Sequence, residues 1–451
     1  MVRLWVVGLI IASAATAAEA VAPSTVTFNK DVLPILQSNC QNCHRPGQVA
    51  PMSLLTYQDA RPWAKAIKAA VQTRKMPPWN ADPGYSHFLN DRSLSQGQID
   101  TLVAWADNGA LEGNAKDAPP PKQWPAGGWE VQPDIIVDSP EFDVPASGVI
   151  DWFWVPIAGA MFTKDTWITS IQFLPLDPSV VHHTGIAFVP HKGDVMYNEP
   201  IWERVQRDAN LITMPGQKFV PTVVSLMGIG GREQDTYVPG HTMSDYRRYN
   251  AARLIPANTD VYLNLHYTPN GHPVRTHVRV GFTVAKESPR RQVFMAMVSS
   301  PTDRERFRIP ANDADWTAPA GEATFSRDVE IFSMMPHMHV RGKSMIYTLT
   351  YPDGKRETIL NVPRYDFNWQ LQYDTAIHVP KSSKLRVEAH YDNSAGNRYN
   401  PDPNHDVFYG EQTWEEMMIG YVGVIVDDPT PNLDPRQLFE KDPMTANRAA
   451  R

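Results

Sequence analysis

The two cysteines of this 451-residue chain lie close together, in Cys40-Gln41-Asn42-Cys43-His44, and no other cysteine is present. The C-x-x-C-H pattern is typical of c-type haem attachment, in which both thiols become thioethers and the adjoining histidine ligates iron. A redox-active dithiol is the alternative, but it does not need His44. The motif predicts one covalently bound haem c and therefore a small domain that wraps the haem.

The start of the chain predicts export. One arginine, a short apolar stretch and Ala-x-Ala sites between Ala15 and Ala20 are typical of a secretory signal peptide. The apolar stretch is too short for a spanning helix, although a retained N-terminal anchor is the alternative. We therefore expect residues 1–20 to be a signal peptide and the mature protein to be periplasmic, without a membrane span.

A low-spin haem needs a sixth ligand from the face opposite His44, and two methionines are candidates. Met52 follows His44 so closely that the chain would have to be nearly extended to wrap the ring. Met76 follows an expected helix over residues 62–72 and precedes two prolines. We therefore predict that Met76 ligates the iron, while a packing methionine remains the alternative.

Further helices are expected around these ligands, over residues 29–38 and from the capping pattern at Ser95 to about Gly109. They predict an all-α cytochrome c domain over residues 24–113. A stretch rich in proline and glycine then predicts a linker over residues 114–128.

The remainder of the chain changes to short alternating runs broken by proline, glycine and asparagine, as in Val261–Tyr267 and Lys384–Tyr391. This pattern is typical of antiparallel β-sandwiches. A basic, proline-containing stretch near residues 287–291 divides the region into two similar halves. We expect two sandwich domains, over residues 129–286 and 290–435.

Each half carries a close pair of histidines and a further donor about 80 residues later. The first half has His182-His183 and then His266, which strand alternation places on a polar face. The second has His337 and His339, whose spacing puts both rings on one side of an extended segment. Met417 offers a thioether, a soft donor that favours Cu(I), and the two sets therefore predict two copper ions. Met418 and His390 are the alternatives to Met417.

These ordered motifs resemble the copper type II, ascorbate-dependent monooxygenases, the family of peptidylglycine alpha-hydroxylating and dopamine beta-monooxygenases. The resemblance covers most of residues 150–425 and rests on the two histidine pairs, on His266-Tyr267 and on the acid-then-methionine step Glu416-Met417. It implies two jelly-roll-like sandwiches facing each other across a cleft. The full fold class expected is thus a small all-α cytochrome c domain followed by two all-β jelly-roll-like sandwich domains.

The resemblance also implies roles for the ligands. His182, His183 and His266 would hold an electron-storing copper, and His337, His339 and Met417 would hold the copper that binds O2. Tyr421 matches a tyrosine of the family's substrate pocket.

The chain departs from the family in two ways. Its cysteines belong to haem rather than to disulfides, and Met335 stands where peptide-hydroxylating members carry an arginine. A C-terminal glycine substrate is therefore not expected.

The expected function is copper-dependent hydroxylation of a C–H bond by O2, with electrons passing from a periplasmic donor through the haem. The substrate is an unidentified small molecule or peptide. A periplasmic electron-transfer or copper-binding protein without oxygenase activity is the alternative. The net charge of −7, without runs of like charge, argues against nucleic acid as a partner.

Overall fold

The computed structural model describes residues 25–150, 152–157, 162–191, 193, 195–203, 219–220, 233–410, 412–428 and 433–441. Strands account for 37% of the residues and helices for 14%, so the protein is mainly β-sheet. The signal peptide predicted over residues 1–20 lies outside the described residues. No helix in the described part of the chain is long and apolar enough to cross a membrane.

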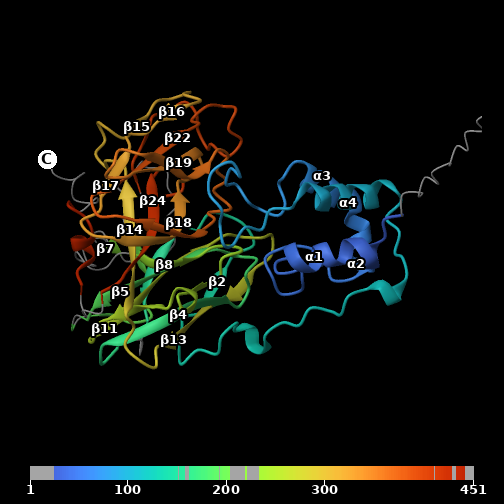
Figure 1. Ribbon diagram of the computed structural model, residues 1–451, viewed down its shortest axis with the longest axis horizontal. Helices are drawn as coiled ribbons and strands as arrows, with labels where there is room; N and C mark the ends of the chain where they lie inside the picture. Colours follow the sequence, from blue (N-terminus) through green and yellow to red (C-terminus); the bar gives the residue numbers. More distant parts are fainter. Residues whose placement is uncertain are drawn as a thin grey trace, which may run out of the picture.

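The helices of the N-terminal part gather to one side of the sheets (Figure 1). They are η1 Phe28–Val32, α1 Leu33–Asn39, α2 Tyr57–Ala60, η2 Arg61–Trp63, α3 Ala64–Gln72 and α4 Gln96–Asp107. Helix α4 starts at the predicted capping box, where Ser95 Oγ accepts from the Gln98 amide and Gln98 Oε1 accepts from the Ser95 amide. The helices share a small core that includes Phe28, Leu36 and Trp105.

The predicted fold class is wrong. The N-terminal part is not a self-contained all-α domain, because its helices are short and residues 73–94 contain none. Two prolines after Met76 prevent a helix there. Trp79 and Ala81 instead pack into the core of the C-terminal sheets, which offers these apolar side chains more burial than the small helical core. The chain is instead mostly β-sheet, and the segment that follows its helices packs against the sheets through Trp79 and Ala81.

The strands up to residue 286 are β1 Ile135–Asp138, β2 Phe142–Val144, β3 Phe153–Pro156, β4 Thr166–Pro175, β5 Val181–Pro190, β6 Ile201–Glu203, β7 Phe219–Val220, β8 Glu233–Tyr237, β9 Met243–Asp245, β10 Ala251–Ile255, β11 Thr259–Tyr267, β12 Val274–Thr276 and β13 Val278–Val284. One sheet has the order β7-β6-β3-β11-β5-β8, and β12 pairs with β2. Phe153, Ile171, Val261 and Phe282 belong to the core of this half.

The later strands are β14 Arg291–Ser299, β15 Arg308–Ile309, β16 Trp316–Thr317, β17 Gly321–Thr324, β18 Val329–His337, β19 Gly342–Thr350, β20 Arg356–Val362, β21 Tyr373–Val379, β22 Lys384–Tyr391, β23 Val407–Phe408 and β24 Ile419–Val426. Short 3-10 turns complete the described elements: η3 Ala115–Asp117, η4 Ala126–Gly128, η6 Arg247–Tyr249 and η7 Pro435–Leu438. A sheet of order β16-β22-β19-β20, with β17 on β22, covers one side of this half.

One large sheet joins the two halves. Its order is β1-β13-β4-β10-β14-β24-β18-β21, with β9 on β4. The junction is a parallel contact of only two residue pairs, Ala251 with Arg291 and Ala252 with Gln292. Phe332 and Ile425, from strands β18 and β24, also pack into the core of the first half. The halves are therefore joined by backbone pairing as well as by side chains.

The stretch predicted as a linker, residues 114–128, lies against the C-x-x-C-H motif. Lys122 Nζ donates to Asn42 Oδ1 at 2.8 Å, and the Arg45 guanidinium stacks 3.9 Å from the Trp124 ring centroid. These contacts place the chain beside the two cysteines before it enters β1.

Candidate metal centres

The first histidine set, His182, His183 and His266, comes from two paired strands and is called the trihistidine set. In the antiparallel pairing of β5 with β11, His266 lies opposite His183, whereas Tyr267 lies opposite Val181. His182 is thus the extra residue of a β-bulge. Consecutive side chains in a regular strand point to opposite faces, and a bulge re-aims one of them. The bulge explains how both rings of the pair reach His266.

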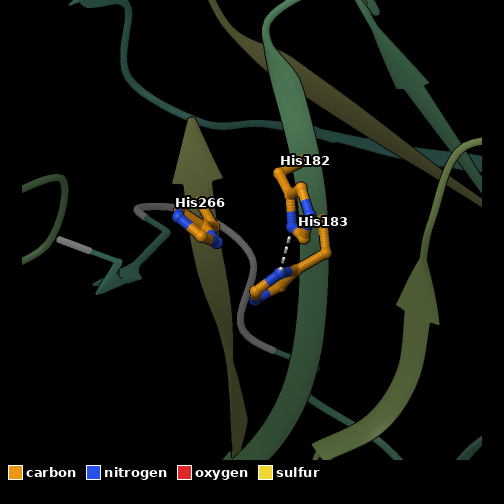
Figure 2. Close-up of side chains that lie close together, drawn as sticks. All are labelled: His182, His183 and His266. Carbon is orange, nitrogen blue, oxygen red and sulfur yellow. Dashed lines mark hydrogen bonds between the residues drawn. The ribbon is translucent and has the colours of Figure 1, made fainter. Parts of the chain in front are cut away.

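The three imidazoles of this set lie close enough to share one ion. One nitrogen from each ring can be chosen so that all lie within 4.8 Å of one another. The His266 ring centroid is 4.9 Å from those of His182 and His183, and the side chains point toward one another in Figure 2. His182 Nε2 and His266 Nδ1 are buried and have no hydrogen-bond partner in the structure. Buried polar atoms are nearly always paired, and these two nitrogens are available to a ligand.

Asn264 orients the ring of His183. His183 Nε2 lies 3.1 Å from Asn264 Oδ1, and Nδ1 lies 3.3 Å from His182 Nδ1. In the tautomer in which Nε2 donates to Asn264, Nδ1 is the nitrogen left for an ion.

Burial keeps these imidazoles neutral. It lowers the pKa of His182 to about 4, with a smaller contribution from His337, while Asp366 opposes the shift. Burial and then the neighbouring imidazoles hold the pKa of His183 and of His266 well below the ordinary value. Neutral imidazole is the form that binds a metal ion.

The second histidine set, His337 and His339, lies at the end of β18 and is called the His-x-His set. The two ring centroids are 5.3 Å apart. His337 Nδ1 lies 2.6 Å from Gln370 Oε1, and His339 Nδ1 lies 3.2 Å from the Glu415 carbonyl oxygen. In the tautomers in which each Nδ1 donates, the Nε2 atoms remain for a metal ion. Burial lowers the pKa of both rings, that of His339 to about 3.

Met417 precedes β24, the strand that pairs with β18. His337 and Ile419 form the last residue pair of the two strands. Met417, two residues before Ile419, lies in one apolar cluster with Ile419 and Tyr421. Met418 points into the core on the other face of the sheet. The alternative ligand His390 is held on β22 beside Asp315, at 3.3 Å, so the arrangement favours Met417.

Tyr421, which is buried, contacts the same set. It pairs with Met335 on β18 and Met297 on β14, and its ring centroid lies 6.0 Å from that of His337. Met417 and Tyr421 belong to one apolar cluster with these methionines. The structure therefore places His337 close to His339 and Tyr421, and Tyr421 in one cluster with Met417, while the role of Met417 as a ligand stays a prediction.

Sequence reasoning missed the role of Glu416, which is fully buried. Its two carboxylate oxygens accept from the backbone amides of His339, at 2.8 Å, and Arg341, at 2.6 Å. Burial raises the pKa of Glu416 to about 8, although these amides and the Arg341 guanidinium oppose the rise. Through these hydrogen bonds Glu416, the residue before Met417, holds the backbone at His339 and Arg341. Its only sequence signal was its place before a methionine.

Phe367, a second residue that the sequence did not single out, contacts one ring of each histidine set. The Phe367 ring stacks on His182, with centroids 4.7 Å apart, and lies edge-on to His339 at 6.1 Å. Phe367 lies in the loop between β20 and β21, where sequence gives no periodicity to place a side chain.

The residues predicted to bind haem lie at the end of α1. Cys40 and Cys43 are half-buried free thiols, and burial, followed by the Cys43 thiolate, raises the pKa of Cys40 to about 12. His44 Nδ1 lies 3.3 Å from the Met52 carbonyl oxygen, which in the donating tautomer leaves Nε2 for iron. Met52 packs against the helical core, and Met76 as the sixth ligand stays a prediction.

No protein-family model and no curated protein matches the chain. Among solved structures, it is similar to the infectious bursal disease virus Gx strain, with 10% identity and a TM-score of 0.18 over 68% of this chain and 74% of that one. The VP2 subviral particle of that virus gives 10% identity and a TM-score of 0.19, over 67% and 73% of the two chains. The stem and receptor-binding domain of spike protein P1 from bacteriophage PM2 gives 10% and 0.14, over 66% and 98%. Similarity this weak carries no argument about fold or function.

Proposed function

We propose that the protein is a periplasmic, copper-dependent monooxygenase that hydroxylates a C–H bond with O2 and receives electrons through a c-type haem. One observation carries the proposal: two sets of neutral imidazoles, one of three histidines and one of two, contact a single aromatic ring, Phe367. The resemblance to the copper type II, ascorbate-dependent monooxygenases supports the same assignment.

The donor sets fit copper. Three imidazoles suit copper in both oxidation states, and a thioether added to two imidazoles favours Cu(I). The unpaired nitrogens of His182 and His266 support a resident ion at the trihistidine set. At the His-x-His set, support comes from the Nδ1 contacts of both rings, because histidine ligands are usually oriented in this way.

Copper bound at the two sets would supply the one-electron chemistry by which O2 gives one oxygen atom to the C–H bond and the other to water, with two electrons from the donor and two protons from the solvent. The protein's own residues then have positioning roles. Gln370 and the Glu415 carbonyl orient the rings of His337 and His339, and Glu416 fixes the backbone between them and Met417. Tyr421, beside His337, is the residue best placed to orient a substrate.

The C-x-x-C-H motif fits haem c. Cys40 and Cys43 would form the thioethers, and the Met52 carbonyl orients His44 for the iron. Phe367 contacts His182 and His339, so it would exclude water from the space beside one ring of each set.

The copper-to-iron ratio of haem-loaded protein, after copper reconstitution and removal of the excess, tests the metal content. Two copper ions per haem iron are expected, and absence of tightly bound copper would refute the proposal. Oxygen consumption with added reductant then separates a monooxygenase from an electron-transfer or copper-binding protein. Two copper ions without oxygen consumption, in the presence of varied C–H substrates, would favour the second class.

A further inference from the structure

A segment that follows the C-x-x-C-H motif holds both ends of a loop that contacts both histidine sets. This docking segment, residues 79–92, runs from the helical part to the sheets. The loop, residues 363–372, connects β20 to β21 and is called the β20–β21 loop. The segment and the loop are far apart in sequence, so their contacts belong to the tertiary structure alone.

At the end of β20, the docking segment is bound through Asp82. The Asp82 amide donates to the Asn361 carbonyl at 2.8 Å, and the Asn361 side-chain nitrogen donates back to Asp82 Oδ2 at 3.3 Å. This reciprocal pair fixes the chain just before the β20–β21 loop begins.

At the start of β21, the docking segment is bound through Asn90. The Asn90 side chain donates to the Gln372 carbonyl and accepts from the Asp374 amide, both at 2.9 Å. The Leu89 amide donates to the Asp374 carbonyl at 2.8 Å. Between these two ends, Trp79 packs edge-on against Tyr373, with ring centroids 4.9 Å apart.

The β20–β21 loop in turn contacts both histidine sets. Phe367 stacks on His182 and lies against His339, while Gln370 holds Nδ1 of His337. Tyr365 Oη donates to the carbonyl of Met338, the residue between the two histidines, at 2.6 Å. A shift of either end of the loop therefore displaces groups that orient three of the five imidazoles.

The docking segment also reaches the first half of the protein. Arg92 Nη2 donates to the Gly240 carbonyl at 3.0 Å, in the turn between β8 and β9. Strand β8 pairs with β5, where Tyr237 lies opposite Thr184, the neighbour of His183. The segment thus contacts both halves within a few residues.

We infer that the docking segment is a positioning element that couples the haem-bearing part of the chain to both copper sites, by fixing the ends of the β20–β21 loop. The inference rests on the proposed copper binding and deepens it. Because coupling between two sites is reciprocal, copper binding should order the docking segment as much as the docked segment favours copper.

Asn90→Ala tests the inference in full-length, haem-loaded protein. The substitution removes both side-chain hydrogen bonds at the start of β21 without touching a histidine. Asn114→Ala is the matched control, because Asn114 only caps a short turn through the Lys116 amide. We expect Asn90→Ala to weaken Cu(I) binding about 10-fold, the lower end of the range for residues that support metal ligands. Competition with a chromogenic Cu(I) chelator measures this affinity.

Asp82→Ala, at the other end of the loop, should act in the same direction and change the Cu(II) electron paramagnetic resonance spectrum, while the haem absorbance spectrum stays intact. A purely structural role would lower thermal stability without altering that copper spectrum. Unchanged Cu(I) affinity in both Asn90→Ala and Asp82→Ala would overturn the inference.

Hydrogen exchange in copper-free protein keeps the inference testable even if copper fails to bind. Amides of residues 363–372 should exchange faster in Asn90→Ala than in Asn114→Ala. Equal exchange rates would overturn the positioning role. Faster exchange in a protein that binds no copper would preserve the positioning role and refute the proposed function instead.

Discussion

The two histidine sets are built in different ways. The trihistidine set lies within two paired strands, and a single β-bulge turns His182 toward its neighbours. The His-x-His set lies at the end of β18, and its partners come from loops: Gln370 from the β20–β21 loop and Glu415 and Glu416 from the segment before β24. Hydrogen bonds between β5 and β11 hold the trihistidine set directly, whereas the His-x-His set depends on groups that lie in loops. We therefore expect the second set to be more sensitive to changes in its surroundings.

The largest effect is expected at Met417. In Met417→Ala, the His-x-His set loses its thioether, and turnover should fall by about 100-fold or more, beyond the usual effect of losing a residue that only supports a ligand. The copper of the trihistidine set and the haem absorbance should be unchanged. Steady-state oxygen consumption and metal content measure these outcomes. Retained activity would show that Met417 is not a ligand.

Gln370→Ala should have the next largest effect. Without the Gln370 oxygen, His337 Nδ1 loses its partner, and copper affinity at the His-x-His set should fall about 10- to 100-fold. Titration with Cu(I) should resolve this weakened site from the unaffected trihistidine site. An equal loss at both sites would show that Gln370 acts on the whole loop rather than on His337 alone.

Glu416→Gln tests the buried carboxyl group. A carboxamide has one acceptor oxygen, so above about pH 8, where the Glu416 carboxyl group is ionised, either the His339 or the Arg341 amide loses its partner, at a cost of about 1–3 kcal/mol in the free energy of unfolding. Denaturant unfolding measures this difference. Glu388→Gln is the control, because Glu388 forms a half-exposed ion pair with Arg386 and should change stability by less than about 1 kcal/mol. Equal losses of stability in Glu416→Gln and Glu388→Gln would show that the buried hydrogen bonds of Glu416 contribute no more than an exposed ion pair.

Asn264→Ala tests whether strand pairing protects the trihistidine set. It removes the hydrogen-bond partner of His183 Nε2, just as Gln370→Ala removes the partner of His337 Nδ1. Because His183 is also fixed by the pairing of β5 with β11, we expect Cu(I) affinity to fall only about three-fold, less than is usual for such partners. A loss as large as that in Gln370→Ala would show that strand pairing does not protect the first set.

Part of this protein could be predicted from local sequence. The C-x-x-C-H motif, the capping box at Ser95 and the spacing of the histidines each depend on residues a few positions apart, and the structure brings together His182, His183 and His266 as a possible metal site. The expected identity of the metal stays a prediction, because donor type indicates a preference rather than an ion.

Other features depended on contacts that local sequence does not encode. The prediction of a separate all-α cytochrome domain was wrong, because Trp79 is buried against a sheet that is distant in the sequence. The sheet shared by the two halves depends on two residue pairs. Phe367, Gln370 and Glu416 meet the histidines only through loops and distant segments.

The sequence by itself determined which donors are available and how they are spaced along the chain, since covalent spacing fixes what one strand or one motif can present. The tertiary structure alone decided which donors meet and which groups orient them. Such contacts join residues that are separated in the sequence by about 30 positions in one case and by more than 180 in another. Their geometry follows from the packing of whole sheets rather than from any local pattern.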